Sequence, residues 1–155
     1  MPSRRDLVRM TDEEIDAFLH APQQTMNVAT YNHDGTIHLV AMWYGFYEGK
    51  PAFETFTKSQ KVLNLRRDNR ITVLIEDGKE YEKLRGLELV GTADVIDDPE
   101  AVMAVARTVV PRYFEVAKPE DIEAIAAGLA VKRSAIVINA ERTVSWDHNK
   151  LGGTY

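Results

Sequence analysis

Residues 55–77 read TFTKSQKVLNLRRDNRITVLIED, and this stretch carries more structural information than any other in the chain. Its first residues are typical of a strand. Residues 59–67 (SQKVLNLRR) predict a short helix with apolar side chains available for packing, among them Val62 and Leu65. Residues 71–76 return to the apolar and β-branched composition of a strand. We therefore expect a strand, a short helix and another strand in succession.

The same stretch is strongly basic. Between residues 58 and 70 a single acid, Asp68, accompanies five bases: Lys58, Lys61, Arg66, Arg67 and Arg70. A helix start offers free N–H groups, a lysine adds a point charge, and Thr57 and Ser59 add hydroxyl donors at the same junction. The pattern indicates a phosphate site. A solvated helix face is the alternative, and on charge alone it is the commoner explanation. We expect the three arginines to lie at the surface or to pair with acids.

The rest of the chain also reads as an alternation of strands and short helices. Strands are expected at residues 25–31, 36–47, 52–57, 71–76, 84–96 and 134–144, and helices at 11–19, 59–67, 100–110 and 119–128. Thr11 and Glu14 form a capping-box pattern. Turn signals at Asp34-Gly35 and at 48–51 predict that the first three strands form an antiparallel meander. We expect one domain over residues 1–155, mainly β (α+β), with six strands that form a small barrel or a strongly curled sheet and with short peripheral helices.

Composition narrows the possible functions. The 155 residues are 45% hydrophobic and 28% charged, as in a globular protein, and the net charge of −5 argues against a dedicated nucleic-acid binder. The absence of cysteine excludes disulfides, thiolate metal sites and cysteine nucleophiles. The four histidines (His20, His33, His38 and His148) show no metal-ligand spacing, so we expect no metal site. No apolar run approaches the roughly 20 residues that span a bilayer, and we expect a cytoplasmic protein.

Three sequence motifs, taken with their order, resemble one known family. The first is K-x-x-N-L-R-R-D from Lys61 to Asp68, followed by Arg70 and an apolar strand. The others are G-x-x-H (Gly35 to His38) and L-x-G-x-A (Leu89, Gly91 and Ala93). The chain from about residue 11 to 145 thus resembles the pyridoxamine 5'-phosphate oxidase-like split β-barrel superfamily, and in particular its flavin/deazaflavin (F420)-dependent oxidoreductase branch.

The resemblance implies a six-stranded antiparallel split β-barrel of the FMN-binding-like type. It also implies a homodimer with two cofactor sites at the subunit interface. It implies that Lys61 contacts the cofactor phosphate and that the second and third strands line the ring system. Thr55 and Thr57 share one face of the third strand by the two-residue period. Arg85 is expected to reach the partner's cofactor. The full cofactor-binding set expected is Lys61, Lys58, Ser59, Thr57, Thr55, Asn64, Val40, Ala41, Met42, Trp43 and Arg85.

The chain also departs from the family pattern. Ile37 and Ala41 stand where members often have proline, and Ser59 stands where they often have arginine, so Lys58 is the candidate to supply that charge. Arg4 and Arg5 are candidate contacts for the acidic tail of a deazaflavin. The tail over residues 146–155 is either a substrate cover or a frayed end, with Trp146 expected near the pocket.

Three functions remain open at this level. The first is a coenzyme F420-dependent oxidoreductase that transfers a hydride to or from an unsaturated or quinone-like small molecule. The sequence offers no catalytic constellation, which suits hydride transfer because the chemistry belongs to the cofactor. The second is an FMN-dependent oxidoreductase of pyridoxamine-phosphate-oxidase type, disfavoured because no substrate-binding arginine–histidine set appears near the C-terminus. The third is a non-catalytic protein that binds a flavin, F420 or haem.

Overall fold

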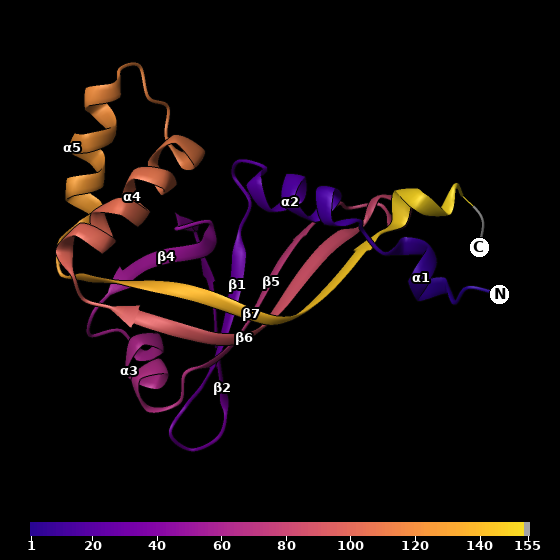
Figure 1. Cartoon of the computed structure of the whole chain (residues 1–155), viewed down its shortest axis with the longest axis horizontal. Helices are drawn as coiled ribbons and strands as arrows, with labels where there is room; N and C mark the ends of the chain where they lie inside the picture. The colour runs from indigo at the N-terminus through magenta and orange to yellow at the C-terminus, as the bar shows by residue number, and fades with distance from the viewer. Residues whose placement is uncertain (154–155) are drawn as a thin grey trace.

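A computed structural model of the chain describes residues 1–153, so residues 154–155 of the expected domain and tail lie outside it. Within the described part, seven strands form one sheet in the order β2-β1-β5-β6-β7-β4-β3. The strands are β1 (Met26–Tyr31), β2 (Ile37–Met42), β3 (Gly45–Tyr47), β4 (Lys50–Phe56), β5 (Arg70–Asp77), β6 (Arg85–Ile96) and β7 (Arg133–Asp147). All neighbouring pairs are antiparallel. Figure 1 shows the sheet curling, with the long β6 and β7 running across it.

Five α-helices within residues 1–153 lie around the sheet. They are α1 (Arg4–Val8), α2 (Asp12–His20), α3 (Gln60–Arg67), α4 (Pro99–Tyr113) and α5 (Pro119–Ala130), with the short 3-10 turns η1 (Tyr81–Lys83) and η2 (His148–Leu151). In Figure 1, α4 and α5 lie side by side at one end of the β6–β7 pair and α1 lies with η2 at the other. No helix in residues 1–153 has the length and apolar composition that crossing a membrane requires.

The core lies on the concave face of the curled sheet. Alternate side chains from five strands are fully buried there, as the two-residue period of a strand requires: Met26, Val28, Phe53, Val73, Ile75, Leu87 and Ile136. A second layer forms on the other face of β4 and β7, where a valine stripe of α4 packs. The stripe is Val102, Val105 and Val109, and it faces Ala52, Ala135 and Val137. The expected mainly β class with peripheral helices is confirmed.

Local signals located most elements correctly. The capping box of α2 forms as expected: the Glu14 backbone N–H donates to Thr11 Oγ1 at 3.2 Å, and the Thr11 N–H donates to the Glu14 carboxylate at 2.7 Å. Helix α1 was not expected, yet it begins with the same reciprocal pattern between Ser3 and Asp6. The S-x-x-D spacing is the signal that would have predicted it.

The seventh strand arises because the strand expected at 36–47 is broken at Tyr44. The Tyr44 backbone N–H donates to the Tyr113 hydroxyl at 3.2 Å, and its carbonyl accepts from Arg112 Nε at 3.0 Å. Both backbone groups are therefore bonded to α4 and are lost to the strand ladder. Burial raises the pKa of Tyr44 to about 12, and its hydroxyl donates to the Leu19 carbonyl. The sheet consequently has seven strands where six were expected.

The expected three-strand meander forms only as two separate hairpins, β1–β2 and β3–β4, for the same reason. After the break, the chain continues as β3 and forms a two-residue hairpin with β4, with Glu48 and Gly49 both at positive φ. The other edge of β4 pairs with β7, so that Phe56 lies opposite Arg133 and Glu54 opposite Ala135. The third expected strand thus lies beside the last strand of the chain, and β2 stays at the far edge of the sheet.

Two glycines predict opposite effects on stability. A Cβ at Gly86 would lie 2.0 Å from the Trp146 indole across the β6–β7 ladder, so Gly86→Ala is expected to destabilise the fold by about 1–3 kcal/mol through overpacking. A Cβ at Gly128 in α5 meets nothing within 4 Å, so Gly128→Ala should stabilise by about 0.5–1 kcal/mol. Urea denaturation of both variants checks the pair. Equal effects of the same sign would contradict this packing of Trp146.

Candidate functional site

Helix α3 is fixed to the sheet by one buried amide. Asn64 is 0% exposed, and its Nδ2 donates to Thr30 Oγ1 at 3.1 Å and to Asn32 Oδ1 at 3.0 Å. Its Oδ1 accepts from Gln60 Nε2 at 2.8 Å and from Arg67 at 3.3 Å. Because the amide nitrogen donates two hydrogen bonds and the amide oxygen accepts two, Asn64 sets the orientation of α3 against β1. It was expected among the cofactor-binding residues, and a ligand contact by Asn64 stays a prediction.

That orientation turns Lys61 into the molecule. Its side chain is only 8% exposed, and within residues 1–153 it has neither a hydrogen-bond partner nor a carboxylate partner. Burial lowers the pKa of Lys61, and the nearby Arg133 guanidinium lowers it further. Ser59, the residue that begins α3, contributes a buried Oγ that is also without a partner in the described chain. A cation and a hydroxyl without a partner therefore both belong to the start of α3.

Two further charged residues lie close by: Arg133 on β7 is near Lys61, and Glu54 on β4 is near Arg133. The Arg133 guanidinium carbon lies 4.3 Å above the centre of the Phe56 ring, and its Nη1 is 3.7 Å from Glu54 Oε1. Burial raises the pKa of the Glu54 carboxyl, whose side chain is 6% exposed. Arg133 Nε and Glu54 Oε2 are both buried and have no partner in the described chain. The sequence analysis named neither residue.

An open cleft adjoins these charges. Its cavity volume is about 300 Å³, and it is lined by Ala41, Met42, Trp43, Glu54, Leu129 and Arg133. Trp43 closes one side by stacking on Tyr113, with ring centres 4.8 Å apart, and by meeting Phe114 edge-on at 5.5 Å. We call the arrangement of Lys61, Ser59, Arg133 and Glu54 with this cleft the α3 site. It has a cationic corner and an apolar wall, as ligand pockets commonly do.

The structure brings together only some of the residues expected at the site. Lys61 and Ser59 both lie at the start of α3, and Ala41, Met42 and Trp43 line the cleft. The remaining ones are placed differently. Val40 packs against the core, Thr55 is buried beside Ser134, the Thr57 hydroxyl bonds to Ser134 Oγ at 2.9 Å, and Lys58 is exposed beside the corner. Ligand contact by any of these residues stays a prediction.

Arg85 lies away from the α3 site. It begins β6, whereas α3 lies near the opposite end of that strand (Figure 1). Its guanidinium donates to both oxygens of Asp77, at 2.8 Å from Nε, and lies 5.0 Å from the centre of the Phe18 ring. A contact with a partner's cofactor therefore stays a prediction, and within one chain Arg85 is already paired.

The arginines of the basic segment are engaged elsewhere, as expected. Arg66 pairs with Asp97 at 2.8 Å, Arg70 pairs with Asp68 at 2.6 Å, and Arg67 donates to the Tyr31 carbonyl. Lys61 differs from them because it is both buried and unpaired. Within residues 1–153, no group of three or more His, Asp or Glu side chains is arranged to hold a metal ion.

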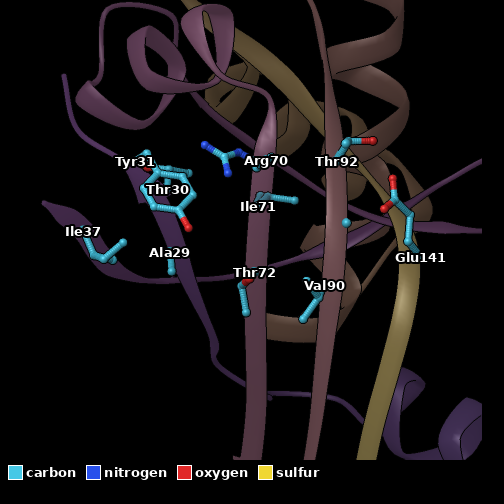
Figure 2. A pocket seen from close by; sticks show the side chains of 11 residues that line it. Ala29, Thr30, Tyr31, Ile37, Arg70, Ile71, Thr72, Val90, Thr92 and Glu141 are labelled. Carbon is cyan, nitrogen blue, oxygen red and sulfur yellow. The ribbon is translucent and has the colours of Figure 1, made fainter. Parts of the chain in front are cut away.

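A second hollow lies on the outer face of the sheet and contains none of the expected site residues. Figure 2 shows side chains from β1, β2, β5, β6 and β7 around it, with Arg70 and Tyr31 near one end and Glu141 at one side. Its cavity volume is about 220 Å³, and the Arg70 guanidinium lies 4.5 Å from the centre of the Tyr31 ring. It lacks the unpartnered buried polar atoms that mark the α3 site.

Comparison with known proteins supports the family that the sequence motifs resemble. The family model described as pyridoxamine 5'-phosphate oxidase matches residues 11–147. Among solved structures, the conserved hypothetical protein Rv2991 from Mycobacterium tuberculosis is 39% identical, with a TM-score of 0.89 over 99% of this chain and 95% of that one. No curated protein is significantly similar to the chain.

Two more distant structures share the fold. A protein described as an F420 reductase is 23% identical, with a TM-score of 0.63 over 83% of this chain and 94% of that one. HutZ, described as the heme storage protein of Vibrio cholerae, is 12% identical, with a TM-score of 0.63 over 86% and 94%. At these identities the likeness concerns the fold alone.

The unpaired charge of Lys61 predicts a gain in stability on its removal. The pKa of Lys61 lies below its ordinary 10.5 in the folded chain, so the unfolded chain binds more protons between the two values and wild-type stability rises with pH across that window. Lys61→Met should therefore stabilise the ligand-free protein at pH 7 by on the order of 1 kcal/mol. The gain should shrink as the pH approaches 10.5.

Urea denaturation at pH 7 and at pH 10 measures this difference. Lys58→Met is the matched control, because Lys58 is exposed and its loss should change stability little. A loss of stability in Lys61→Met at pH 7 would mean that the ammonium has a partner in the free protein and that the corner is not an anion site.

Proposed function

The chain belongs to the pyridoxamine 5'-phosphate oxidase family, and from this premise we propose that it is an oxidoreductase that uses coenzyme F420. Its reaction is a hydride transfer between the deazaflavin and an unsaturated or quinone-like small molecule. The observation that carries the proposal is the buried Lys61 without a counter-ion, at the start of the same helix as the unpartnered Ser59 hydroxyl. Such a pair is costly in a free protein and is satisfied by a phosphate.

The residues of the α3 site fit a phosphate-bearing cofactor. Lys61, the Ser59 hydroxyl and the free N–H groups at the start of α3 would hold the phosphate. The ring system would lie in the cleft along Ala41, Met42 and Trp43. The bound cofactor supplies the hydride chemistry, and the protein supplies orientation, electrostatics and exclusion of water. No side chain needs to act as a nucleophile.

The choice of F420 over FMN depends on the sequence motif. The K-x-x-N-L-R-R-D run resembles the deazaflavin branch, and one structure of the same fold is described as an F420 reductase. Lys58 is exposed beside the corner and is a candidate contact for the acidic tail. Arg4 and Arg5 were expected to share that task, but α1 lies at the opposite end of the molecule from α3 (Figure 1), so they would need a second chain.

Two alternatives use the same site. FMN carries a phosphate and a ribityl chain as well, so an FMN-dependent oxidoreductase would use the same corner and cleft. A non-catalytic binding protein is the other alternative, because HutZ, described as a heme storage protein, shares the fold. Turnover of reduced cofactor with an acceptor separates the enzyme from the binding protein. The cytoplasmic location expected from the sequence stays a prediction.

We also propose that the protein works as a homodimer with a cofactor site at each side of the interface. The edge strand β2 presents apolar side chains to solvent in the single chain: Leu39 is 68% exposed and Ile37 is 54% exposed. Trp43 and Phe56, next to the cleft, are also about half exposed. Exposed apolar side chains in such a group are typical of an interaction surface. A second chain on this face would border the cleft.

Cofactor titration tests the proposed function directly. The purified protein is titrated with oxidised F420 and, separately, with FMN, and fluorescence is followed. We expect tighter binding of F420, and Lys61→Ala should weaken it by about 1.5–3 kcal/mol, as for the loss of a charge-assisted hydrogen bond. Lys79→Ala is the control, since Lys79 is exposed in a turn outside the α3 site.

The three other outcomes of this titration have distinct meanings. Tight FMN binding without F420 affinity would keep the site and move the protein to the flavin alternative. Binding of neither cofactor would remove the redox proposal. Binding that is indifferent to Lys61 would show that the phosphate lies elsewhere.

Light scattering at micromolar concentration tests the dimer. We expect twice the 17.5 kDa mass of the chain. Leu39→Asp should yield monomers, because it places a charge on the apolar edge. Ala127→Asp on the exposed face of α5 should leave the mass unchanged. A monomeric wild type would overturn the shared-site arrangement.

A further inference from the structure

We infer that Glu54 is an acceptor for the hydroxyl groups that adjoin the phosphate of the bound ligand, so the α3 site selects phosphate esters of a polyol chain. The inference rests on the proposed function. It adds a protein contact for the part of the ligand that links the phosphate to the ring. It assigns a ligand-binding role to a carboxylate that neither the sequence motifs nor the family match single out.

The first observation is the position of Glu54 in the strand. It lies on β4 between Ala52 and Phe56 on the same face of the strand, opposite Ala135 on β7, and its side chain is 6% exposed. A carboxylate buried to this extent is costly unless it is paired and hydrogen-bonded. Burial raises the pKa of the Glu54 carboxyl, in keeping with weak compensation by its surroundings. The strand would be better packed with an apolar residue, so packing does not account for the glutamate.

The second observation is that Arg133 does not satisfy it. Glu54 Oε1 lies 3.7 Å from Arg133 Nη1, beyond hydrogen-bond length, and Oε2 is without a partner in the described chain. The Arg85–Asp77 pair shows the difference, because there the guanidinium donates to both carboxylate oxygens, at 2.8 Å from Nε. Arg133 Nε is also buried without a partner. Each half of the Glu54–Arg133 pair therefore keeps unused hydrogen-bonding capacity.

The third observation is where this capacity lies. Glu54 and Arg133 both line the 300 Å³ cleft, and Arg133 is close enough to Lys61 to lower its pKa. A guanidinium and an ammonium only donate hydrogen bonds, whereas an ionised carboxylate only accepts them. A ligand that satisfies all three must carry an anion and, within a few ångströms of it, O–H donors. A phosphate ester of a polyol, such as the ribityl phosphate part of FMN, has this arrangement.

The same chemistry disfavours ligands whose only polar groups are anions. The propionate groups of haem accept hydrogen bonds and offer no donor when ionised, so near Arg133 they would face the buried Glu54 carboxylate as a like charge. Sulfate is the simple probe of this kind, since it can engage Lys61 and Arg133 and has nothing to give to Glu54 at neutral pH.

The experiment compares two ligands on matched variants. FMN binding is followed by fluorescence, and sulfate binding by its competition with FMN. Glu54→Gln should weaken FMN about tenfold, the effect expected for losing one hydrogen bond to a charged group, and should leave sulfate affinity unchanged or higher. Glu76→Gln, an exposed glutamate on β5, is the control and should change neither. Unchanged or tighter FMN binding in Glu54→Gln would overturn the inference and leave Glu54 as a counter-ion of Arg133.

A measurement on the wild-type protein removes any dependence on how the variant folds. A flavin phosphate whose side chain lacks hydroxyl groups should bind wild type about tenfold more weakly than FMN. Equal affinities would overturn the inference. Binding that requires Lys61 but ignores Glu54 and the hydroxyls would overturn this inference alone. Failure of wild type to bind either FMN or F420 would overturn the proposed function together with it.

Discussion

The way in which Tyr44 is bonded governs the rest of the structure. Its backbone N–H and carbonyl are bonded to Tyr113 and Arg112 of α4, so the chain leaves the β2 ladder after Met42 and begins a new strand at Gly45. The redirected chain makes the hairpin with β4, and β4 then closes on β7.

The polar groups of the α3 site lower the free energy of unfolding of the ligand-free protein. Lys61, Glu54 and Arg133 are each partly or fully removed from water and incompletely paired. The surrounding scaffold holds them there at a cost: Asn64 fixes α3 on β1, and the β4–β7 ladder sets Arg133 beside Phe56. Uncompensated polar groups of this kind are uncommon in native structures, and they point to a ligand as the missing partner.

The side chains of the site also favour some classes of ligand over others. A cationic corner alone would accept any phosphate, and an apolar cleft alone would accept many flat rings. The carboxylate between them adds a requirement for hydrogen-bond donors, which a ribityl phosphate meets and an ionised propionate does not. Among the structures that share the fold, one is described as an F420 reductase and another as a heme storage protein. Because one fold can serve different ligands, we propose that discrimination between them belongs to these few side chains.

The sequence by itself determined the local structure and half of the site. Capping boxes, turn glycines and two-residue periodicity located most helices and strands, because each of these signals acts between residues a few positions apart. The K-x-x-N-L-R-R-D run identified Lys61 and its family. The break at Tyr44 depends on Tyr113, 69 positions away, and the Glu54–Arg133 pair depends on two strands that are remote in the chain. Only the tertiary structure decided these, because which strands pair is set by the packing of distant segments, and the local periodicity of a strand does not record its partner.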